Sequence, residues 1–195
     1  MNSQGNNLLI LGAGQYGVMA AEIAKAMGAF GRIAFLDDSF CTCHPECNDV
    51  SRQISLIGCF ADLSKFAGEF QYGFVAIGNP SLRRKLVEQL QANGITLATL
   101  VHPTAYVSPS AKIANGCCIE PNATVQTGAT LGLATFVASG SVARHNADVG
   151  EFCHVDCNAV VETLAIVPSE THIACGSVFA RTPVNGTSHG EGANA

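Results

Sequence analysis

A repeat of six residues dominates the second half of the chain. Residues 105–182 can be written as thirteen consecutive hexapeptides without an insertion or a deletion. Each block begins with a small residue, and its third residue is aliphatic in almost every block. These third residues are Val107, Ile113, Ile119, Val125, Leu131, Val137, Ala143, Val149, Val155, Val161, Val167, Ile173 and Phe179. A period of six fits neither an α-helix nor the simple alternation of a long strand. It is the period of a parallel β-helix.

The repeat predicts a triangular coil in which each hexapeptide forms one short strand and one corner. Three blocks then complete one turn, and residues eighteen apart lie above one another at the strand spacing of about 4.8 Å. The third residue of each block points inward. The sixth position favours residues that tolerate the left-handed backbone of a tight corner, namely Gly116, Asn122, Gly128, Gly140, Asn146, Asn158 and Gly176. An antiparallel β-sandwich is the alternative, but a frame this long and unbroken favours the coil.

The N-terminal half begins with the pattern of a nucleotide-binding turn. The apolar segment NLLIL is followed by GAGQYG and an amphipathic helix, and Gly12, Gly14 and Gly17 fit G-x-G-x-x-G. The second strand, RIAFLDD, ends in Asp37 and Asp38. In such a unit a helix N-terminus faces a phosphate and an acidic residue binds a ribose. The motif predicts a phosphate-bearing nucleotide, with an NAD site and an unliganded tight turn as the alternatives.

Further strands are expected at ISLIG, YGFVAIG and ITLATL, with a short helix near Asp62 and a longer one from Pro80 to Asn93. These strands, alternating with helices, make a small parallel α/β domain that ends near Leu100. The expected domains are a Rossmann-like nucleotide-sugar-binding domain at residues 1–100, a β-helix at 101–183, and a polar tail at 184–195.

Composition excludes several classes of function. Hydrophobic residues make up 48% of the chain and charged residues 13%, which indicates a packed protein. The net charge is −5 and there is no run of Lys or Arg, so neither nucleic acid nor a membrane surface is an expected partner. The sequence shows no signal peptide and no apolar segment that could span a bilayer, so we expect a cytoplasmic protein.

Cysteines gather in the irregular segment before ISLIG. The string CTCHPEC contains Cys41, Cys43, His44 and Cys47. Soft ligands this close could bind zinc, but their spacing matches none of the usual C-x-x-C pairs. We therefore expect a solvent-exposed loop and no metal site. The nine cysteines of the chain need not form disulfides, because free cysteine packs as a small hydrophobe.

The segments LILGAGQYG, IAFLDD, VAIGNPSLRRK, LVHPTAYVSPSA and VARHNADVGEFCHV occur in this order and cover nearly the whole chain. Together they resemble the sugar acyltransferase family that includes the bacillosamine-pathway UDP-4-amino-sugar N-acetyltransferases and the sialic acid O-acetyltransferases. The resemblance implies a homotrimer of left-handed β-helices with acetyl-CoA between neighbouring coils. It also implies transfer of an acetyl group to the amine, or hydroxyl, of a nucleotide-activated sugar held by the N-terminal domain, with a UDP-4-amino-sugar as the expected substrate.

The resemblance assigns roles to individual residues. His145 matches the family's general base, and imidazole suits the removal of a proton from an amine near neutral pH. His154 and Gly176 match positions beside acetyl-CoA. The positions that match nucleotide-sugar contacts are Gly12, Gly14, Asp37, Asp38, Asn79 and Arg83.

The frame of the repeat also predicts where these histidines lie. His145 occupies the fifth position of its block, at an outer edge where it can face a neighbouring subunit. His172 follows His154 by eighteen residues, so the two rings should stack, and Cys175 should stack on Cys157.

Three features depart from the family's pattern. Asn146 replaces the acidic residue after the catalytic histidine, Ala138 replaces an asparagine, and the coil is about eighteen residues shorter. A neutral amide cannot offset the charge of an imidazolium, so a weaker base is expected. The alternative function is therefore a non-catalytic trimeric relative that binds a sugar nucleotide and has a weakened coenzyme site.

Overall fold

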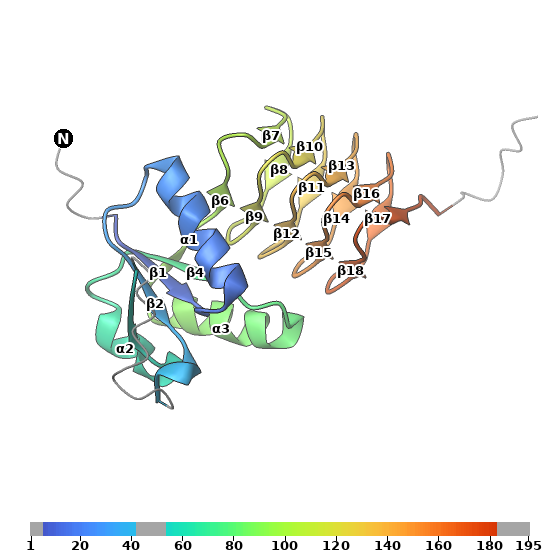
Figure 1. Ribbon diagram of the computed structural model, residues 1–195. Coiled ribbons are helices and arrows are strands. Elements are labelled where there is room, and N and C mark those ends of the chain that lie inside the picture. The colour runs from blue at the N-terminus through green and yellow to red at the C-terminus, as the bar shows by residue number, and fades with distance from the viewer. Residues whose placement is uncertain (1–5, 42–53, 183–195) are drawn as a thin grey trace, which may run out of the picture.

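The computed structural model describes residues 6–41 and 54–182 and shows an α/β domain packed against one end of a β-helix (Figure 1). In the first domain the strands and helices alternate along the chain. The strands are β1 (Leu8–Leu11), β2 (Ile33–Leu36), β3 (Ser55–Gly58), β4 (Tyr72–Val75) and β5 (Thr96–Leu97). The helices are α1 (Gln15–Met27), η1 (Asp38–Cys41), η2 (Phe60–Asp62), α2 (Leu63–Phe66) and α3 (Pro80–Ala92).

The first domain is built around a parallel sheet in the order β3-β2-β1-β4-β5. The central strand β1 is apolar throughout and fully buried. Leu8 and Ile10 pack on the side of α1, whereas Leu9 and Leu11 pack on the side of α2 and α3. The predicted parallel α/β domain is confirmed. The sheet has five strands, and the strand expected at ITLATL is reduced to Thr96–Leu97, which pairs with β4.

The coil begins immediately after β5. Each of its strands has two residues, taken from the second and third positions of a hexapeptide. They are β6 (Leu100–Val101), β7 (Tyr106–Val107), β8 (Lys112–Ile113), β9 (Cys118–Ile119), β10 (Thr124–Val125), β11 (Thr130–Leu131), β12 (Phe136–Val137), β13 (Val142–Ala143), β14 (Asp148–Val149), β15 (His154–Val155), β16 (Val160–Val161), β17 (Ile166–Val167), β18 (His172–Ile173) and β19 (Val178–Phe179).

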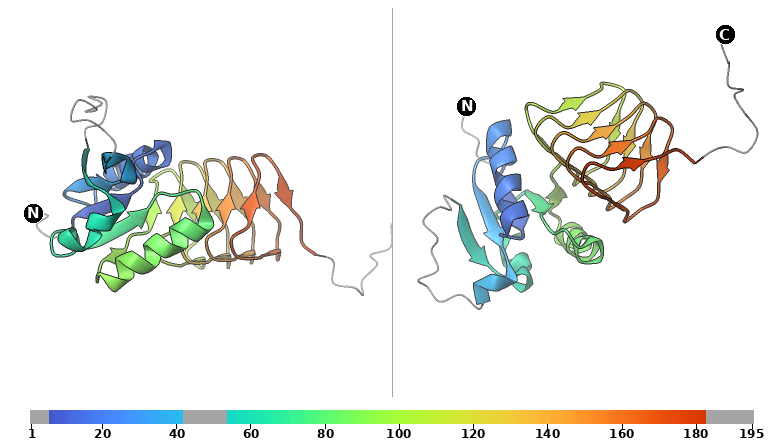
Figure 2. Two further views of the ribbon diagram at one scale, coloured as in Figure 1. Left: turned by 90° about the horizontal axis from the view of Figure 1, so that it is seen from below. Right: turned by 45° about the vertical axis from the view of Figure 1, so that its right-hand side comes forward.

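These strands form the three sides of the coil (Figure 2). The sheets have the orders β19-β16-β13-β10-β7, β17-β14-β11-β8 and β18-β15-β12-β9-β6, and every pair is parallel. Paired residues are eighteen apart, as in Thr124 and Val142. The predicted left-handed β-helix of hexapeptide repeats is confirmed. Its first strand already begins at Leu100, which pairs with Cys118.

The interior of the coil is filled by the first and third residues of each block. Val125, Val137 and Val155 are fully buried third-position residues, and Ala129 and Ala159 are fully buried first-position residues. A small first residue leaves room for the larger third residues inside a narrow three-sided core.

Left-handed backbone marks the corners. Every sixth-position residue from Gly116 to Gly176 has a positive φ. The expected glycines and asparagines are there, and so are Ala134, Phe152, Leu164 and Glu170, which the sequence did not single out. A side chain in this region costs roughly 1–2 kcal/mol. The stacking of the strands therefore determines the corner conformation whichever residue occupies it.

We expect Val137→Asp to abolish the folded coil, because Val137 is fully buried among apolar side chains. An unpaired charge there should destabilise the protein by about 3–5 kcal/mol. Thermal unfolding followed by circular dichroism measures the effect. Lys112→Asp, at an exposed second-position residue, is the control and should unfold like the wild type. Similar melting temperatures for both variants would contradict this account of the core.

Candidate functional site

The glycine turn between β1 and α1 has a steric reason for two of its three glycines, Gly12 and Gly17. Gly12 has a φ of 106°, and a Cβ on it would lie 2.8 Å from the carbonyl oxygen of Ala76. A Cβ on Gly17 would lie only 2.0 Å from the carbonyl oxygen of Gly12. Gly14 is exposed, and no side chain caps the helix that follows it. The turn thus presents the N-terminus of α1 at the surface, as a phosphate site requires.

Asp37 and Asp38 lie at the carboxyl end of β2, beside this turn. Asp37 accepts hydrogen bonds from the backbone N–H groups of Ala13, at 2.8 Å, and Ser39, at 2.9 Å. Asp38 accepts one from the N–H of Phe60 at 3.0 Å. Asp37 therefore holds the glycine turn against the second strand. A ribose contact for either carboxylate stays a prediction.

Asp38 also lines a pocket of about 250 Å³ between the end of β2 and helix α3. Apolar side chains line most of it, and the polar side chains stand at a few points. The other lining residues are Phe60, Ala61, Leu82, Lys85, Leu86 and Gln89. Such a mixture is typical of small-molecule sites.

Asn79 and Arg83 form the start of helix α3. The side-chain oxygen of Asn79 accepts a hydrogen bond from the N–H of Leu82 at 2.9 Å, which caps the helix. Arg83 is fully buried, and burial lowers the pKa of its guanidinium from the ordinary value. The predicted contacts of Asn79 and Arg83 with a nucleotide-sugar stay predictions.

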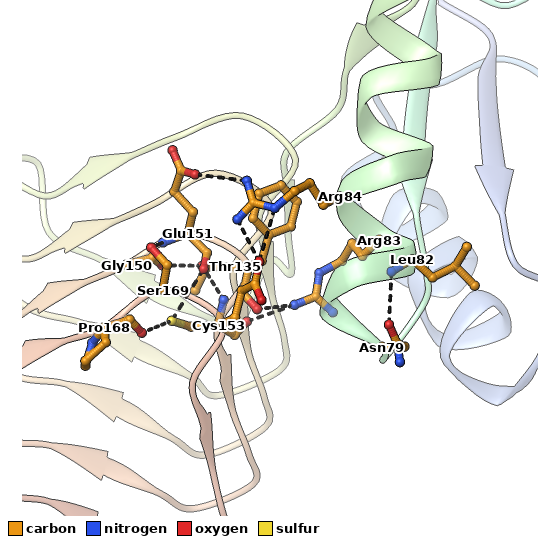
Figure 3. Close-up of polar contacts among 12 residues, drawn as sticks. Asn79, Leu82, Arg83, Arg84, Thr135, Gly150, Glu151, Cys153, Pro168 and Ser169 are labelled. Atoms are coloured by element: carbon orange, nitrogen blue, oxygen red, sulfur yellow. Dashed lines mark hydrogen bonds and ion pairs between the residues drawn. The ribbon is translucent and has the colours of Figure 1, made fainter.

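The Arg83 guanidinium joins the two domains (Figure 3). Its Nη1 donates to the carbonyl oxygens of Ile77 and Gly78, at 2.8 and 3.1 Å. Its Nη2 donates to the carbonyl oxygen of Phe152 in the coil, at 2.5 Å. The guanidinium also lies over the ring of Phe136, 4.2 Å from the ring centre.

The neighbouring Arg84 reaches the same corner of the coil from outside. Its guanidinium lies 4.1 Å from the ring centre of Phe152 and pairs with Glu170 at 2.8 Å and Glu151 at 3.6 Å. These contacts explain why a phenylalanine occupies a left-handed corner, since its ring packs beneath Arg84. Sequence reasoning missed Arg84, because nothing local distinguishes it from a solvated helix arginine.

Tyr16 provides a second joint between the domains. Its hydroxyl donates to Oε1 of the buried Glu120 at 3.1 Å, and burial raises the pKa of the tyrosine well above its ordinary value. Oε2 of Glu120 accepts hydrogen bonds from the N–H and the hydroxyl of Ser139, at 3.0 and 2.9 Å. The Tyr16 ring stacks on Phe136 at 4.8 Å. The residue inside the glycine turn is thus anchored directly to the coil.

Two histidines share a pocket between helix α3 and the coil. Burial lowers the pKa of His154, so its imidazole is neutral near neutral pH. His172 pairs with His154 one turn further along the coil, as predicted, and the two rings lie 5.4 Å apart, tilted by 56° instead of stacked face to face. The pocket has a volume of about 250 Å³ and is lined by Gly78, Pro80, Arg83, Phe152, His154, Glu170, Thr171 and His172.

His145 lies at an exposed corner between β13 and β14. This corner joins two sides of the coil, whereas His154 belongs to the third side. A corner of a three-sided coil lies opposite the third side. The structure therefore does not bring His145 and His154 together within one chain.

Asn146 follows His145 and supports the corner itself. Its side-chain oxygen lies 2.2 Å from the point that a Cβ on Gly128 would occupy, one turn below. Asn158 and Gly140 repeat the arrangement at 2.4 Å. Asparagine at these corners thus covers a glycine of the preceding turn.

Gly176 occupies the corner after β18 with a φ of 68°. Its N–H donates to the carbonyl oxygen of Cys157 at 2.9 Å. A Cβ on Gly176 would meet no atom within 4 Å, so open surface surrounds it. Its predicted contact with acetyl-CoA stays a prediction.

The possible zinc ligands Cys43, His44 and Cys47 lie outside the described residues, as does the side chain of Cys41. Within residues 6–41 and 54–182, no group of three or more His, Cys, Asp or Glu side chains is arranged to hold a metal. Among the helices of the same ranges, none has the length and apolar character that a membrane span requires.

Adjacent arginines allow a matched test of the domain joint. Arg83→Met leaves buried carbonyl oxygens without their donor and should lower the free energy of unfolding by about 2–4 kcal/mol. Arg84→Met keeps an apolar side chain beside Phe152 and removes exposed ion pairs and the guanidinium contact with the ring, which contribute little at the surface, so its loss should be much smaller. Urea unfolding measures both variants. Equal losses would show that Arg83 is not the main joint.

Residues 7–90 match the family described as the PglD N-terminal domain. UDP-N-acetylbacillosamine N-acetyltransferase of Bacillus subtilis (strain 168) is 30% identical over 113 residues, which are 58% of this chain and 50% of that protein. The alignment thus spans half the length of that curated relative.

Solved structures resemble nearly the whole chain. The acetyltransferase domain of PglB from Neisseria gonorrhoeae FA1090, in complex with acetyl coenzyme A, is 30% identical with a TM-score of 0.77, covering 90% of this chain and 92% of that one. PerB from Caulobacter crescentus, in complex with CoA and GDP-perosamine, is 21% identical with a TM-score of 0.72, covering 93% and 92%. At that lower identity the likeness shows the fold alone.

Proposed function

Because the chain belongs to the hexapeptide-repeat family of acetyl-CoA-dependent sugar acetyltransferases, we propose that it transfers an acetyl group from acetyl-CoA to an amino group of a nucleotide-activated sugar. The observation that carries the proposal is the likeness to the acetyl-CoA-bound PglB domain over 90% of the chain. The family match to residues 7–90 extends it to the N-terminal domain.

The nucleotide-sugar binds across the carboxyl edge of the parallel sheet, where open α/β sheets bind ligands. Its diphosphate lies at the N-terminus of α1, beside Gly12 and Gly14. Support comes from the uncapped helix and from the neighbouring pocket lined by Asp38 and Lys85. The name of the curated relative specifies a UDP-sugar, so a UDP-4-amino-sugar is the proposed substrate.

His145 serves as the general base. The sugar amine attacks the carbonyl carbon of the thioester, a C–N bond forms, and the C–S bond breaks with its electron pair on sulfur. The proton lost by the nitrogen passes to the imidazole of His145. His145 and His154 lie on opposite sides of one coil, so a site that uses both needs two chains.

The active enzyme is a homotrimer. The side of the coil that leads into the His145 corner has a largely apolar outer surface, formed by the second-position residues Tyr106, Val142, Val160 and Val178 with Thr124 among them. The next side presents Lys112, Thr130, Asp148 and Ile166 at the same positions. Tyr106 is 57% exposed and Val178 60%, so the first surface is uncovered in a single chain. A second copy of the chain packed there would contact this surface beside His145.

Two glutamate substitutions test this assembly. Val160→Glu should break up the trimer and abolish transfer, because a carboxylate would be buried in the apolar interface. Ile166→Glu places the same charge on the side of the coil that follows the His145 corner, and it should leave the trimer and the transfer reaction unchanged. Analytical ultracentrifugation and release of CoA thiol are the readouts. A Val160→Glu trimer with full activity would refute the proposed interface.

The proposed reaction is tested by release of the CoA thiol. Purified protein with acetyl-CoA and a UDP-4-amino-sugar should release free thiol, and the product should be heavier by one acetyl group. Calorimetry separates the alternative of a non-catalytic relative, which would bind the UDP-sugar without binding acetyl-CoA. That binding pattern, together with no thiol release from any UDP-amino-sugar, would refute transfer.

We expect His145→Ala to lower kcat by about 10²–10⁴-fold, the usual effect of losing a general base. The affinity for the UDP-sugar should stay nearly unchanged, because the nucleotide contacts lie in the other domain. His102→Ala, at a histidine bonded to Thr104 near the start of the coil, is the control. A His145→Ala enzyme with wild-type kcat would remove this residue from the mechanism.

A further inference from the structure

The two histidines of the α3 pocket have contrasting surroundings. His154 is packed edge-on against Tyr16 and Phe136, with ring centres 5.8 Å apart in each case. His172 is exposed at the mouth of the same pocket and lies one turn further along the coil. Active sites assign acid and base functions to neighbouring titratable groups by placing them in contrasting environments.

Asp156 is the carboxylate partner of His172. Its Oδ2 lies 3.3 Å from Nε2 of His172, and its Oδ1 accepts a hydrogen bond from the N–H of Cys157 at 2.7 Å. The Cys157 N–H, followed by the contact with His172, holds the pKa of Asp156 below its ordinary value. The carboxylate is therefore ionised near neutral pH. It can orient the imidazole and offset the charge of an imidazolium, while Nδ1 stays available for a ligand.

We propose that His172, oriented by Asp156, is a second proton-transfer residue that donates a proton to the sulfur of CoA as it leaves. This inference rests on the proposed acetyl transfer and assigns a separate step of it. The electron pair of the broken C–S bond stays on sulfur, and the proton of the His172 imidazolium forms the thiol. The proton of the amine goes to His145. Exchange with water returns both histidines to their starting states.

The other charged groups around His172 have partners of their own. Glu170 is paired with Arg84 from helix α3, and Arg83 donates to main-chain carbonyl oxygens. The neighbouring ring of His154 is neutral, because burial lowers its pKa. Asp156 acts on both imidazoles through its charge, but among the described residues of this pocket His172 is the imidazole within hydrogen-bonding distance of it.

His172→Gln tests the proposal by the pH dependence of turnover. The wild type should show a bell-shaped profile, with the acidic side due to the base and the alkaline side due to the acid. In His172→Gln the decline at alkaline pH should disappear, and kcat should fall about 10²-fold while KM for acetyl-CoA changes little. Wild-type kcat with an unchanged alkaline decline would overturn the proposal.

Three variants separate proton transfer from a structural effect. Asp156→Asn should lower kcat in the same direction as His172→Gln, and Asp156→Glu should restore part of it. Glu170→Gln alters another carboxylate of the pocket, which is bound to Arg84, and should keep the wild-type profile. If Glu170→Gln and Asp156→Asn behaved alike, a general loss of pocket structure would explain both, and the assignment would be wrong.

A measurement without turnover separates this proposal from the overall function. In ¹⁵N NMR of the histidine side chains, adding CoA should shift the ring nitrogens of His172 and leave those of His102 unchanged. If no sugar is acetylated but this shift occurs, acetyl transfer fails while the place of His172 beside the thiol stands. If calorimetry detects CoA binding and His172 does not shift, the proposal for His172 fails. Absence of CoA binding would overturn both.

Discussion

The stacking of residues eighteen apart is the constraint on which the rest of the structure depends. It puts a left-handed corner at every sixth position and makes the backbone of one turn the template for the next. The same stacking brings His172 over His154 and sets Asp156 beside His172. Chemistry at the surface of the coil thus follows from hydrogen bonding between turns, without any local motif at those residues.

The interface between the two domains is the second constraint on the candidate site. Phe136 packs against both the Tyr16 ring and the guanidinium of Arg83, and Glu120 in the coil accepts a hydrogen bond from Tyr16. Tyr16 lies inside the glycine turn, and Arg83 lies in the first turn of α3. Both elements that border the proposed nucleotide site are therefore anchored to the coil that carries the histidines, so the α/β domain and the coil pack as one body at this edge (Figure 2).

The sequence predicted the coil, its register and the paired histidines, because a six-residue period repeats across residues 105–182. It could not predict Phe152 or Leu164 at corners, since bulky residues disfavour left-handed backbone and only the neighbouring turns impose it. The partnership of Tyr16 with Glu120 spans 104 positions, and no local pattern signals it. Arginine is rarely buried, so the sequence could not predict the burial of Arg83 either.

The three-sided geometry also determines which changes of length the chain can tolerate. Removing or adding one whole turn leaves every remaining side chain on the same side of the coil and changes only the length of the coil along its axis. A single inserted residue would shift the repeat for all later residues and move core valines to the outer surface, as a register slip does in any sheet. Evolution can therefore lengthen or shorten such a protein in steps of eighteen residues. Each step changes the length of the surface that an extended ligand can contact, while the packing of the core stays the same.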